Sequence, residues 1–491
     1  MRQSGILLHI TSLPGPEGIG TMGKEAYQFA DFLKAADMAI WQVLPISPTG
    51  YGESPYQSFS TYAGNPLLID LALLVEEGLL KPEQQAAQPN RQDSVDYVAV
   101  IAHKEKRLRE AFAAAQSKLD EIAAFVDEQS HWLPDYALFR ALKAHFGGGS
   151  WLAWPDEAIR HRQPDAMRRY TQQFRDEIAF HSFVQYLFFR QWRALKEYAN
   201  GQGIRLFGDM PIYVAMDSSD TWAHPEVFQL DVNLKPLGVA GVPPDYFSRN
   251  GQLWGNPLYN WKALKRTGYR WWMERMRAMG EYFDLIRVDH FIGFSKYYDV
   301  PYGATTARWG QWRRGPGRAF FDRLNQDVPG LNIVAEDLGA VDNRVRGLLK
   351  YCGYPGMKVL CFAFSGEEDN PHLPYHIPRN CVYYTGTHDN DTAMGWWESA
   401  ASSEKKLARK LLGFQKDDQL CEAMLAGVLQ NKANTAILPM QDILCLPTDA
   451  RMNTPGTLGG NWQWRMKPGV ADEELAARLR ELNHQYGRGK T

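Results

Sequence analysis

The stretch FDLIRVDH (283–290) is a short run of apolar and β-branched residues that ends in polar ones. Seven other runs share this composition, and most are followed by a segment with the three- and four-residue apolar spacing of a helix. They are GILLHI (5–10), AIWQVLPI (39–46), IRLFGDMPIYV (204–214), NIVAEDLG (332–339), MKVLCFAF (357–364), CVYYTGTHD (381–389) and TAILPMQDIL (435–444). Eight strands that alternate with helices predict an α/β fold of the (β/α)8 TIM barrel type.

The spacing of these runs predicts two large insertions into one barrel that spans residues 1–491. The gap after the second run is far longer than one helix needs, and its periodicity predicts a helical subdomain over about 70–200. The gap after the third run, about 217–280, is rich in Pro, Gly, Asn and aromatic residues, which predicts a loop that covers a groove. Little chain follows the eighth run, so we expect no C-terminal β-sandwich.

The composition is that of a folded globular protein, with 45% apolar and 22% charged residues. The 54 basic and 56 acidic residues nearly balance, which argues against nucleic acid as a partner. No apolar stretch is long enough to span a membrane, and the first apolar run is too short for a signal peptide. The five cysteines form no C-x-x-C pair, so we expect reduced thiols and a cytoplasmic location.

Three carboxylates stand at the predicted strand ends, where a barrel of this type places its catalytic groups. Asp289 ends the fourth run, Glu336 lies near the end of the fifth, and Asp389 ends the seventh. A single acid in such a position is more often a helix cap or an ion-pair partner. Three that converge on one face predict an active site.

Retaining glycoside chemistry needs an ionised nucleophile and a protonated acid. Arg287 lies two residues before Asp289 on the same strand, so it points to the same side and would hold Asp289 ionised. Glu336 has no basic residue in its immediate stretch, and partial burial with carboxylate neighbours would raise its pKa, as a general acid requires. Asp389 would then bind sugar hydroxyls and favour the transition state.

Two histidines flank these acids. His290 and His388 could donate hydrogen bonds to ring hydroxyls of a sugar. A metal site built from His290, Glu336 and His388 is a rival interpretation, but the sequence has no H-x-x-x-H or H-E-x-x-H spacing and no calcium-loop pattern. We therefore expect neither a metal nor a cofactor.

Longer motifs link these acids to other parts of the chain. They are LHITSLPG (8–15), WQVLPISPTGYGESPYQSFSTYAGNPLLIDL (41–71), GDMPIYVA (208–215), PPDYFSRNGQLWGNPLY (243–259), RVDHF (287–291), AEDLG (335–339), GTHDNDT (386–392) and ARMNTPGTLGGNWQWR (450–465). With them, the chain from about Gly5 to Arg465 resembles the α-amylase clan. Within that clan it is most similar to glycoside hydrolase family 77, the 4-α-glucanotransferases called amylomaltase or disproportionating enzyme.

The resemblance implies a role for each acid: Asp289 as nucleophile, Glu336 as acid/base and Asp389 as transition-state stabiliser. It also implies that Tyr56, Asp209, Arg287 and His388 surround the subsite of the cleaved bond, and that Tyr246 and Phe247 form the tip of a loop over the donor chain. Trp254 and Asn461, which lie inside the family motifs, are further candidates for substrate binding; for Trp254, Trp462 and Trp464 simple packing explains the rings equally well. The chain departs from the family pattern at Ile292, where many relatives carry a basic residue.

Several activities share this set of acids. A transferase passes a glucan segment to another sugar, whereas an amylase-like hydrolase or debranching enzyme passes it to water. An aromatic loop that excludes water favours transfer between α-1,4-glucans or malto-oligosaccharides. A glucan-binding protein without activity is a third interpretation, which the intact set of carboxylates argues against.

Overall fold

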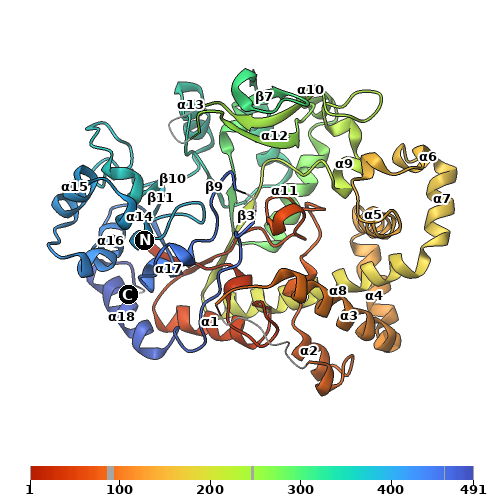
Figure 1. Cartoon of the computed structure of the whole chain (residues 1–491), viewed down its shortest axis with the longest axis horizontal. Coiled ribbons are helices and arrows are strands. Elements are labelled where there is room, and N and C mark those ends of the chain that lie inside the picture. The colour runs from red at the N-terminus through yellow and green to blue at the C-terminus, as the bar shows by residue number, and fades with distance from the viewer. Residues whose placement is uncertain (1, 86–92, 245–247, 458, 490–491) are drawn as a thin grey trace.

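A parallel sheet curled into a barrel forms the centre of the protein (Figure 1). The computed structural model describes residues 2–85, 93–244, 248–457 and 459–489. Within them an eight-stranded sheet has the order β10-β11-β12-β1-β2-β3-β6-β9. Its strands are β1 (Gln3–Leu7), β2 (Ile40–Gln42), β3 (Arg205–Met210), β6 (Leu285–Val288), β9 (Ile333–Ala335), β10 (Gly356–Val359), β11 (Cys381–Tyr384) and β12 (Thr435–Pro439).

The two edge strands of this sheet meet. The N–H group of Ala335 in β9 donates a hydrogen bond of 2.9 Å to the carbonyl of Pro355, which immediately precedes β10. The ladders between neighbouring strands are all parallel, and nearly every strand residue is buried, as expected where helices cover a sheet. The prediction of an α/β barrel is confirmed.

Each of the eight predicted runs overlaps one barrel strand, but the strands are shorter than the runs; β1 and β10 begin just before their runs. The fourth run, 283–290, forms β6 only over Leu285–Val288, and the seventh, 381–389, forms β11 only over Cys381–Tyr384. The polar residues at the ends of these runs lie beyond the hydrogen-bonded strands, in turns at the carboxyl-terminal rim of the barrel. This places Asp289 and Asp389 just beyond their strands.

Helices pack around the barrel in chain order. Amphipathic α1 (Lys24–Ala35) follows β1 and buries its apolar face, including Phe29 and Leu33. The remaining helices that flank barrel strands are α10 (Trp261–Arg266), α11 (Arg270–Tyr282), α12 (Arg318–Asp327), α13 (Asn343–Cys352), α14 (Ala393–Ser399), α15 (Ser402–Leu412), α16 (Leu420–Leu429), α17 (Met440–Ile443) and α18 (Glu473–Gln485). In the described chain after β12, the regular elements are helical.

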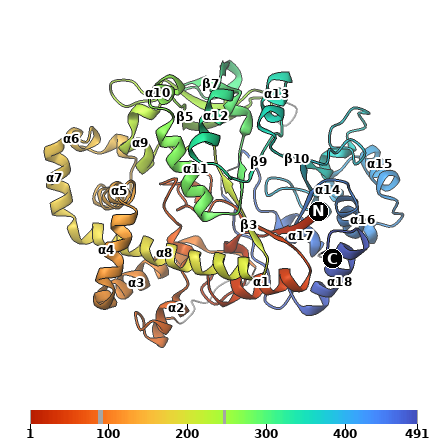
Figure 2. The ribbon, with the colours of Figure 1, turned by 180° about the vertical axis from the view of Figure 1, so that it is seen from behind.

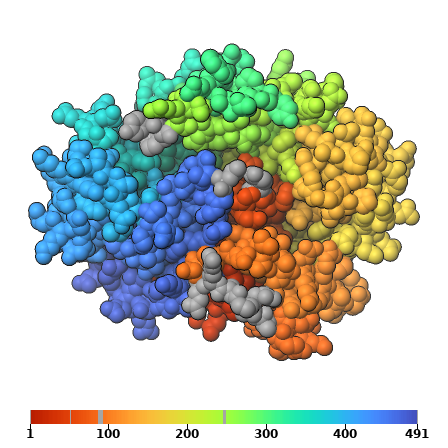
Figure 3. All heavy atoms as spheres, in the orientation of Figure 1, coloured from red at the N-terminus to blue at the C-terminus, as the bar shows by residue number. Residues whose placement is uncertain are grey.

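The segment between β2 and β3 is helical and forms a lobe beside the barrel, coloured orange and yellow in Figures 1 and 3. Its helices are α2 (Leu71–Glu76), α3 (Tyr97–Ala114), α4 (Leu119–Glu128), α5 (Leu133–His145), α6 (Glu157–Arg160), α7 (Pro164–Gln173) and α8 (Arg175–Gly201). Helix α8 runs from this lobe to the barrel, as the reverse view shows (Figure 2). Most of its aromatic residues, among them Phe183, Phe188 and Trp192, are buried, so they serve packing.

A second, antiparallel sheet lies over one side of the barrel, at the top of Figure 1. Its strand order is β5-β4-β7-β8, with β4 (Gly238–Val242), β5 (Gln252–Pro257), β7 (Lys296–Pro301) and β8 (Gln311–Arg314). The short helix α9 (Ser219–Ala223) precedes it. Strands β4 and β5 come from the segment after β3, and β7 and β8 from the segment after β6. The sheet therefore joins the second insertion to the strand that carries Asp289.

The expectation that the cysteines are reduced thiols is wrong for two of them. Cys421 and Cys445 form a disulfide, because α16 and the turn after α17 bring their Cα atoms to 5.7 Å. The thiols of Cys352, Cys361 and Cys381 are free. Among the described residues, no helix is both long and apolar enough to cross a membrane.

Candidate active site

The predicted acids and most of their predicted neighbours lie at the carboxyl ends of barrel strands. Asp289 follows β6, and its N–H group donates a 3.0 Å hydrogen bond to Met210 at the end of β3. Glu336 follows β9, and its N–H group donates to Val288 of β6 at 3.0 Å. Asp389 lies in the turn after β11. The barrel thereby places side chains from distant parts of the sequence on one rim.

Arg287 links Asp289 to a further buried carboxylate, that of Asp209. Its Nη1 atom donates to both oxygens of Asp209 at 2.7 Å, and its Nη2 atom lies 2.9 Å from Oδ1 of Asp289. Burial opposes the charge of Arg287, but Asp209 and Asp289 together raise its pKa well above the ordinary value. Asp289 thus faces the permanent positive charge of Arg287.

Glu336 is in the opposite electrostatic situation. Its side chain is buried, and burial together with the nearby charge of Asp289 raises its pKa to about 8, although Arg287 acts against this shift. Its carboxyl group accepts two main-chain hydrogen bonds, from the N–H of His290 at 2.8 Å and from the N–H of Leu338 at 2.7 Å. At neutral pH, Glu336 therefore holds a proton, whereas Asp289 is paired with Arg287.

Tyr56, Asp209 and His388 form a hydrogen-bonded group next to this pair. The hydroxyl of Tyr56 donates to Asp209 at 2.7 Å, so its oxygen can accept a hydrogen from Nε2 of His388, which lies 2.9 Å away. The rings of Tyr56 and His388 stack with centroids 5.2 Å apart. Four predicted substrate-binding residues, counting Arg287, thus share one network.

Asp389 is held by two residues that the sequence analysis did not single out. The side-chain amide of Asn453 donates to its Oδ1 atom at 2.7 Å, and the guanidinium of Arg451 donates to its backbone carbonyl at 2.6 Å. Both residues belong to the motif ARMNTPGTLGGNWQWR (450–465), which marks the segment but not which of its residues reaches Asp389. The carboxylate of Asp389 is nearly half exposed, so it remains open to a ligand.

His290, the residue after Asp289, packs against Trp254. The ring of His290 meets the ring of Trp254 edge-on, with centroids 4.9 Å apart. The Nε2 atom of His290 is buried and has no hydrogen-bond partner in the described structure. Burial lowers the pKa of His290 to about 4, so its imidazole is neutral at pH 7 and one ring nitrogen carries a hydrogen.

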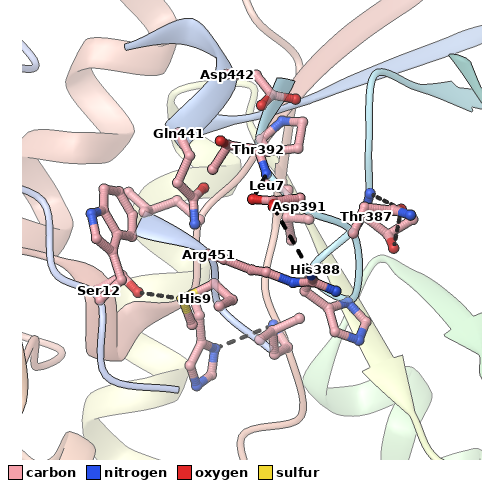
Figure 4. Close-up of a pocket in the computed structure, with 16 residues that line it drawn as sticks. Leu7, His9, Ser12, Thr387, His388, Asp391, Thr392, Gln441, Asp442 and Arg451 are labelled. Atoms are coloured by element: carbon pink, nitrogen blue, oxygen red, sulfur yellow. Dashed lines mark hydrogen bonds and ion pairs between the residues drawn. The ribbon is translucent and has the colours of Figure 1, made fainter. Parts of the chain in front are cut away.

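A pocket lined by polar and apolar side chains, His388 among them, lies between the segments that follow β1, β11 and β12 (Figure 4). His9, Thr387, Gln441 and Arg451 line it. Burial and the nearby His388 lower the pKa of His9 to about 3, so His9 is neutral as well. Across the described residues, no group of three or more His, Cys, Asp or Glu side chains could hold a metal ion.

Comparison with known proteins identifies the family of this protein. A sequence model of 4-alpha-glucanotransferase, glycoside hydrolase family 77, matches residues 8–471. The chain belongs to this family. A 4-alpha-glucanotransferase of Thermus thermophilus is 46% identical, and the match covers 98% of each chain. A chloroplastic/amyloplastic 4-alpha-glucanotransferase of Arabidopsis thaliana is 42% identical over 99% of this chain and 86% of its own.

The fold agrees with this membership. An amylomaltase from Streptococcus agalactiae, solved in complex with acarbose, superposes with a TM-score of 0.97 and covers all of both chains at 40% identity. The resemblance to the 4-α-glucanotransferases is confirmed. The relatives named here carry transferase names, so the comparisons support the transferase prediction over the hydrolase alternative.

The candidate residue Asn461 of this family member makes its hydrogen bonds within its own loop. Asn461 accepts a hydrogen bond from the N–H of Thr454 at 2.9 Å and is close to Thr457, so its side chain braces its own loop. Tyr246 and Phe247 lie outside the described residues. Trp462 and Trp464 are buried, and Ile292 is buried within the turn Phe291–Phe294.

Proposed function

We propose that this protein transfers α-1,4-glucan segments from a donor to the 4-hydroxyl of an acceptor glucan or glucose, by a retaining double displacement. The observation that carries this proposal is the contrast between two neighbouring acids. Asp289 is paired with Arg287, whereas buried Glu336 has a pKa of about 8. A retaining enzyme needs this pair of opposite protonation states.

In the first step, the carboxylate of Asp289 attacks the anomeric carbon of the donor. The glucosidic bond breaks, and the departing oxygen takes the proton of Glu336. The donor segment is then held as an ester on Asp289. In the second step, the ionised Glu336 takes the proton of the acceptor 4-hydroxyl, whose oxygen attacks the same carbon and releases Asp289. Retention follows from the two displacements.

The surrounding residues have supporting roles in this proposal. Asp389 binds sugar hydroxyls and favours the distorted, positively charged transition state. Tyr56, Asp209, Arg287 and His388 surround the reacting sugar, and the hydrogen-bond network among them supports this arrangement.

His290, Trp254 and Asn461 complete the proposed substrate-binding set, together with the predicted loop tip, Tyr246 and Phe247. The free Nε2 atom of His290 supports a contact with a sugar hydroxyl. The helical segment of about 70–200 would act as a supporting subdomain. The segment of about 217–280 would act as the lid that excludes water, so that sugar hydroxyls outcompete it.

The experiment that tests the proposal is the product profile from maltotriose. We expect glucose together with oligosaccharides longer than maltotriose, resolved by chromatography. Maltose and glucose without elongation would instead indicate a hydrolase. The variant Asp289→Asn is the matched control, because it keeps the shape of the side chain and removes the nucleophile; undiminished turnover in this variant would show that Asp289 is not the nucleophile.

We propose that the protein acts in the cytoplasm on α-1,4-glucans and malto-oligosaccharides, and not on nucleic acid. The near balance of 54 basic and 56 acidic residues supports the exclusion of nucleic acid as a partner. Fractionation of the host cell tests the cytoplasmic location.

A further inference from the structure

The turn that follows the nucleophile strand has an uncommon backbone conformation. His290 has φ of 47° and ψ of 50°, in the left-handed region, between strand β6 and the turn Phe291–Phe294. Side chains of L-amino acids are disfavoured there, with Asn, Asp and His tolerated better than most and β-branched residues least. Strain of this kind persists only where the surrounding structure imposes it.

The left-handed turn directs two successive N–H groups to one residue. The N–H of His290 donates to Oε2 of Glu336 at 2.8 Å, and the N–H of Phe291 donates to the backbone carbonyl of Glu336 at 3.1 Å. Consecutive N–H groups converge in this way when one residue of a turn is left-handed. Because Leu338 donates to Oε1 at 2.7 Å, both oxygens of the carboxyl group are held by main chain.

The imidazole of His290 takes no part in this arrangement. Its Nε2 atom has no partner in the described structure, and its ring packs edge-on against Trp254. The side chain and the backbone of His290 therefore face different groups. Their contributions can be separated by substitution.

We propose that His290 is a positioning residue whose left-handed backbone conformation fixes the carboxyl group of Glu336 beside Asp289. This inference rests on the proposed role of Glu336 as acid/base. Because His290 directly follows Asp289, its N–H group ties the carboxyl group of Glu336 to the segment that carries the nucleophile. Glu336 and Asp289 therefore keep their relative position during both steps. Hydrogen bonds from N–H groups also favour the ionised carboxyl, which the second step needs as a base.

The test compares Asn and Val at position 290. Both remove the imidazole, but Asn adopts the left-handed conformation readily and β-branched Val resists it. Besides the main-chain donors, the charged groups near Glu336 are Arg287, Asp289 and Asp337, and neither variant changes them. The readout is the pH profile of kcat/KM for maltotriose, with thermal unfolding as the check on folding.

We expect His290→Asn to keep the alkaline limb of this profile. His290→Val should lose roughly tenfold or more in kcat, and its alkaline limb should move up by about one pH unit, because the donors that favour the carboxylate are lost. Equal profiles for the two variants would overturn the inference. If His290→Val does not fold, His290→Gly and His290→Ala give the same comparison, since Gly adopts the left-handed region without strain.

The variant Glu336→Gln separates the inference from the proposed function. An active Glu336→Gln variant would refute the acid/base role itself. An inactive Glu336→Gln variant together with equal Asn and Val profiles would refute only the positioning role of His290.

Discussion

The Nη2 atom of Arg287 lies 2.9 Å from Oδ1 of Asp289, and both oxygens of Asp209 hold the same guanidinium through Nη1. A planar guanidinium can contact two carboxylates at once, whereas a lysine ammonium acts as a point charge. The position of the proposed nucleophile therefore depends on the fork geometry of Arg287 as well as on its charge.

Replacement of Arg287 by Lys should lower kcat/KM for maltotriose by about a hundredfold, because a misplaced nucleophile loses alignment with the anomeric carbon. The measurement is glucose release under initial-rate conditions. Arg313→Lys is the matched control, since Arg313 pairs with Asp299 at the surface of the second sheet, away from the rim. A similar loss in both variants would contradict the special role of Arg287.

The pH dependence of the reaction should reflect Glu336. Its pKa of about 8 means that the proton needed for the first step is present below pH 8 and is lost above it. We expect kcat/KM for maltotriose to fall as the pH rises through about 8, and Glu336→Gln to be inactive across the range. A value of kcat/KM that keeps increasing from pH 8 to pH 9 would contradict this assignment.

The same pKa has a consequence for stability. In the unfolded chain a Glu ionises near its ordinary pKa of 4.5, whereas in the folded protein Glu336 stays protonated up to about pH 8. A rise in pH between these values therefore favours unfolding. Glu336→Gln removes the ionisable group, so its melting temperature should exceed that of the wild type at pH 8, by a margin that shrinks towards pH 5. A difference in melting temperature that does not change with pH would show that it does not come from the ionisation of Glu336.

Asn453 should matter more for catalysis than Asn461. Asn453→Ala removes the 2.7 Å hydrogen bond to Asp389 and should lower kcat by roughly tenfold to a hundredfold, with little change in melting temperature. Asn461→Ala removes contacts within the loop 454–461 and is the matched comparison. If Asn461→Ala shows the larger loss in kcat, the original prediction that Asn461 binds substrate gains support.

Trp254 should influence the balance between transfer and hydrolysis. Its ring packs against His290 at the edge of the site, so Trp254→Ala should admit water and raise the fraction of glucosyl ester that is hydrolysed. The measurement is the ratio of new reducing ends to total bonds cleaved in maltotriose. Trp309→Ala is the control, because Trp309 is 78% exposed on the connection between β7 and β8. An unchanged ratio in Trp254→Ala would show that Trp254 does not shield the ester.

The disulfide illustrates where sequence reasoning fails. Cys421 and Cys445 are separated by 24 residues with no pattern that marks them as partners. They come together because helices α16 and α17 flank the same strand, β12, and that arrangement is a property of the packed fold. Asn453 was missed for a similar reason, since its contact with Asp389 spans 64 positions of sequence.

The sequence by itself determined the barrel and the three acids. Eight short apolar runs separated by helical segments require a closed parallel sheet, and polar residues at the ends of such runs must meet on one rim, because strands of a parallel barrel all end on the same face. The sequence also placed Arg287 beside Asp289, since residues two apart on a strand share a side.

Only the tertiary structure decided how these groups are held. The pKa of Glu336 depends on its burial and on its distance from Asp289 and Arg287, which no local pattern encodes. The left-handed turn at His290, the amide of Asn453 and the stacked rings of Tyr56 and His388 depend on loops from distant strands. Contacts of this kind depend on the packing of the whole chain, so local sequence patterns do not predict them.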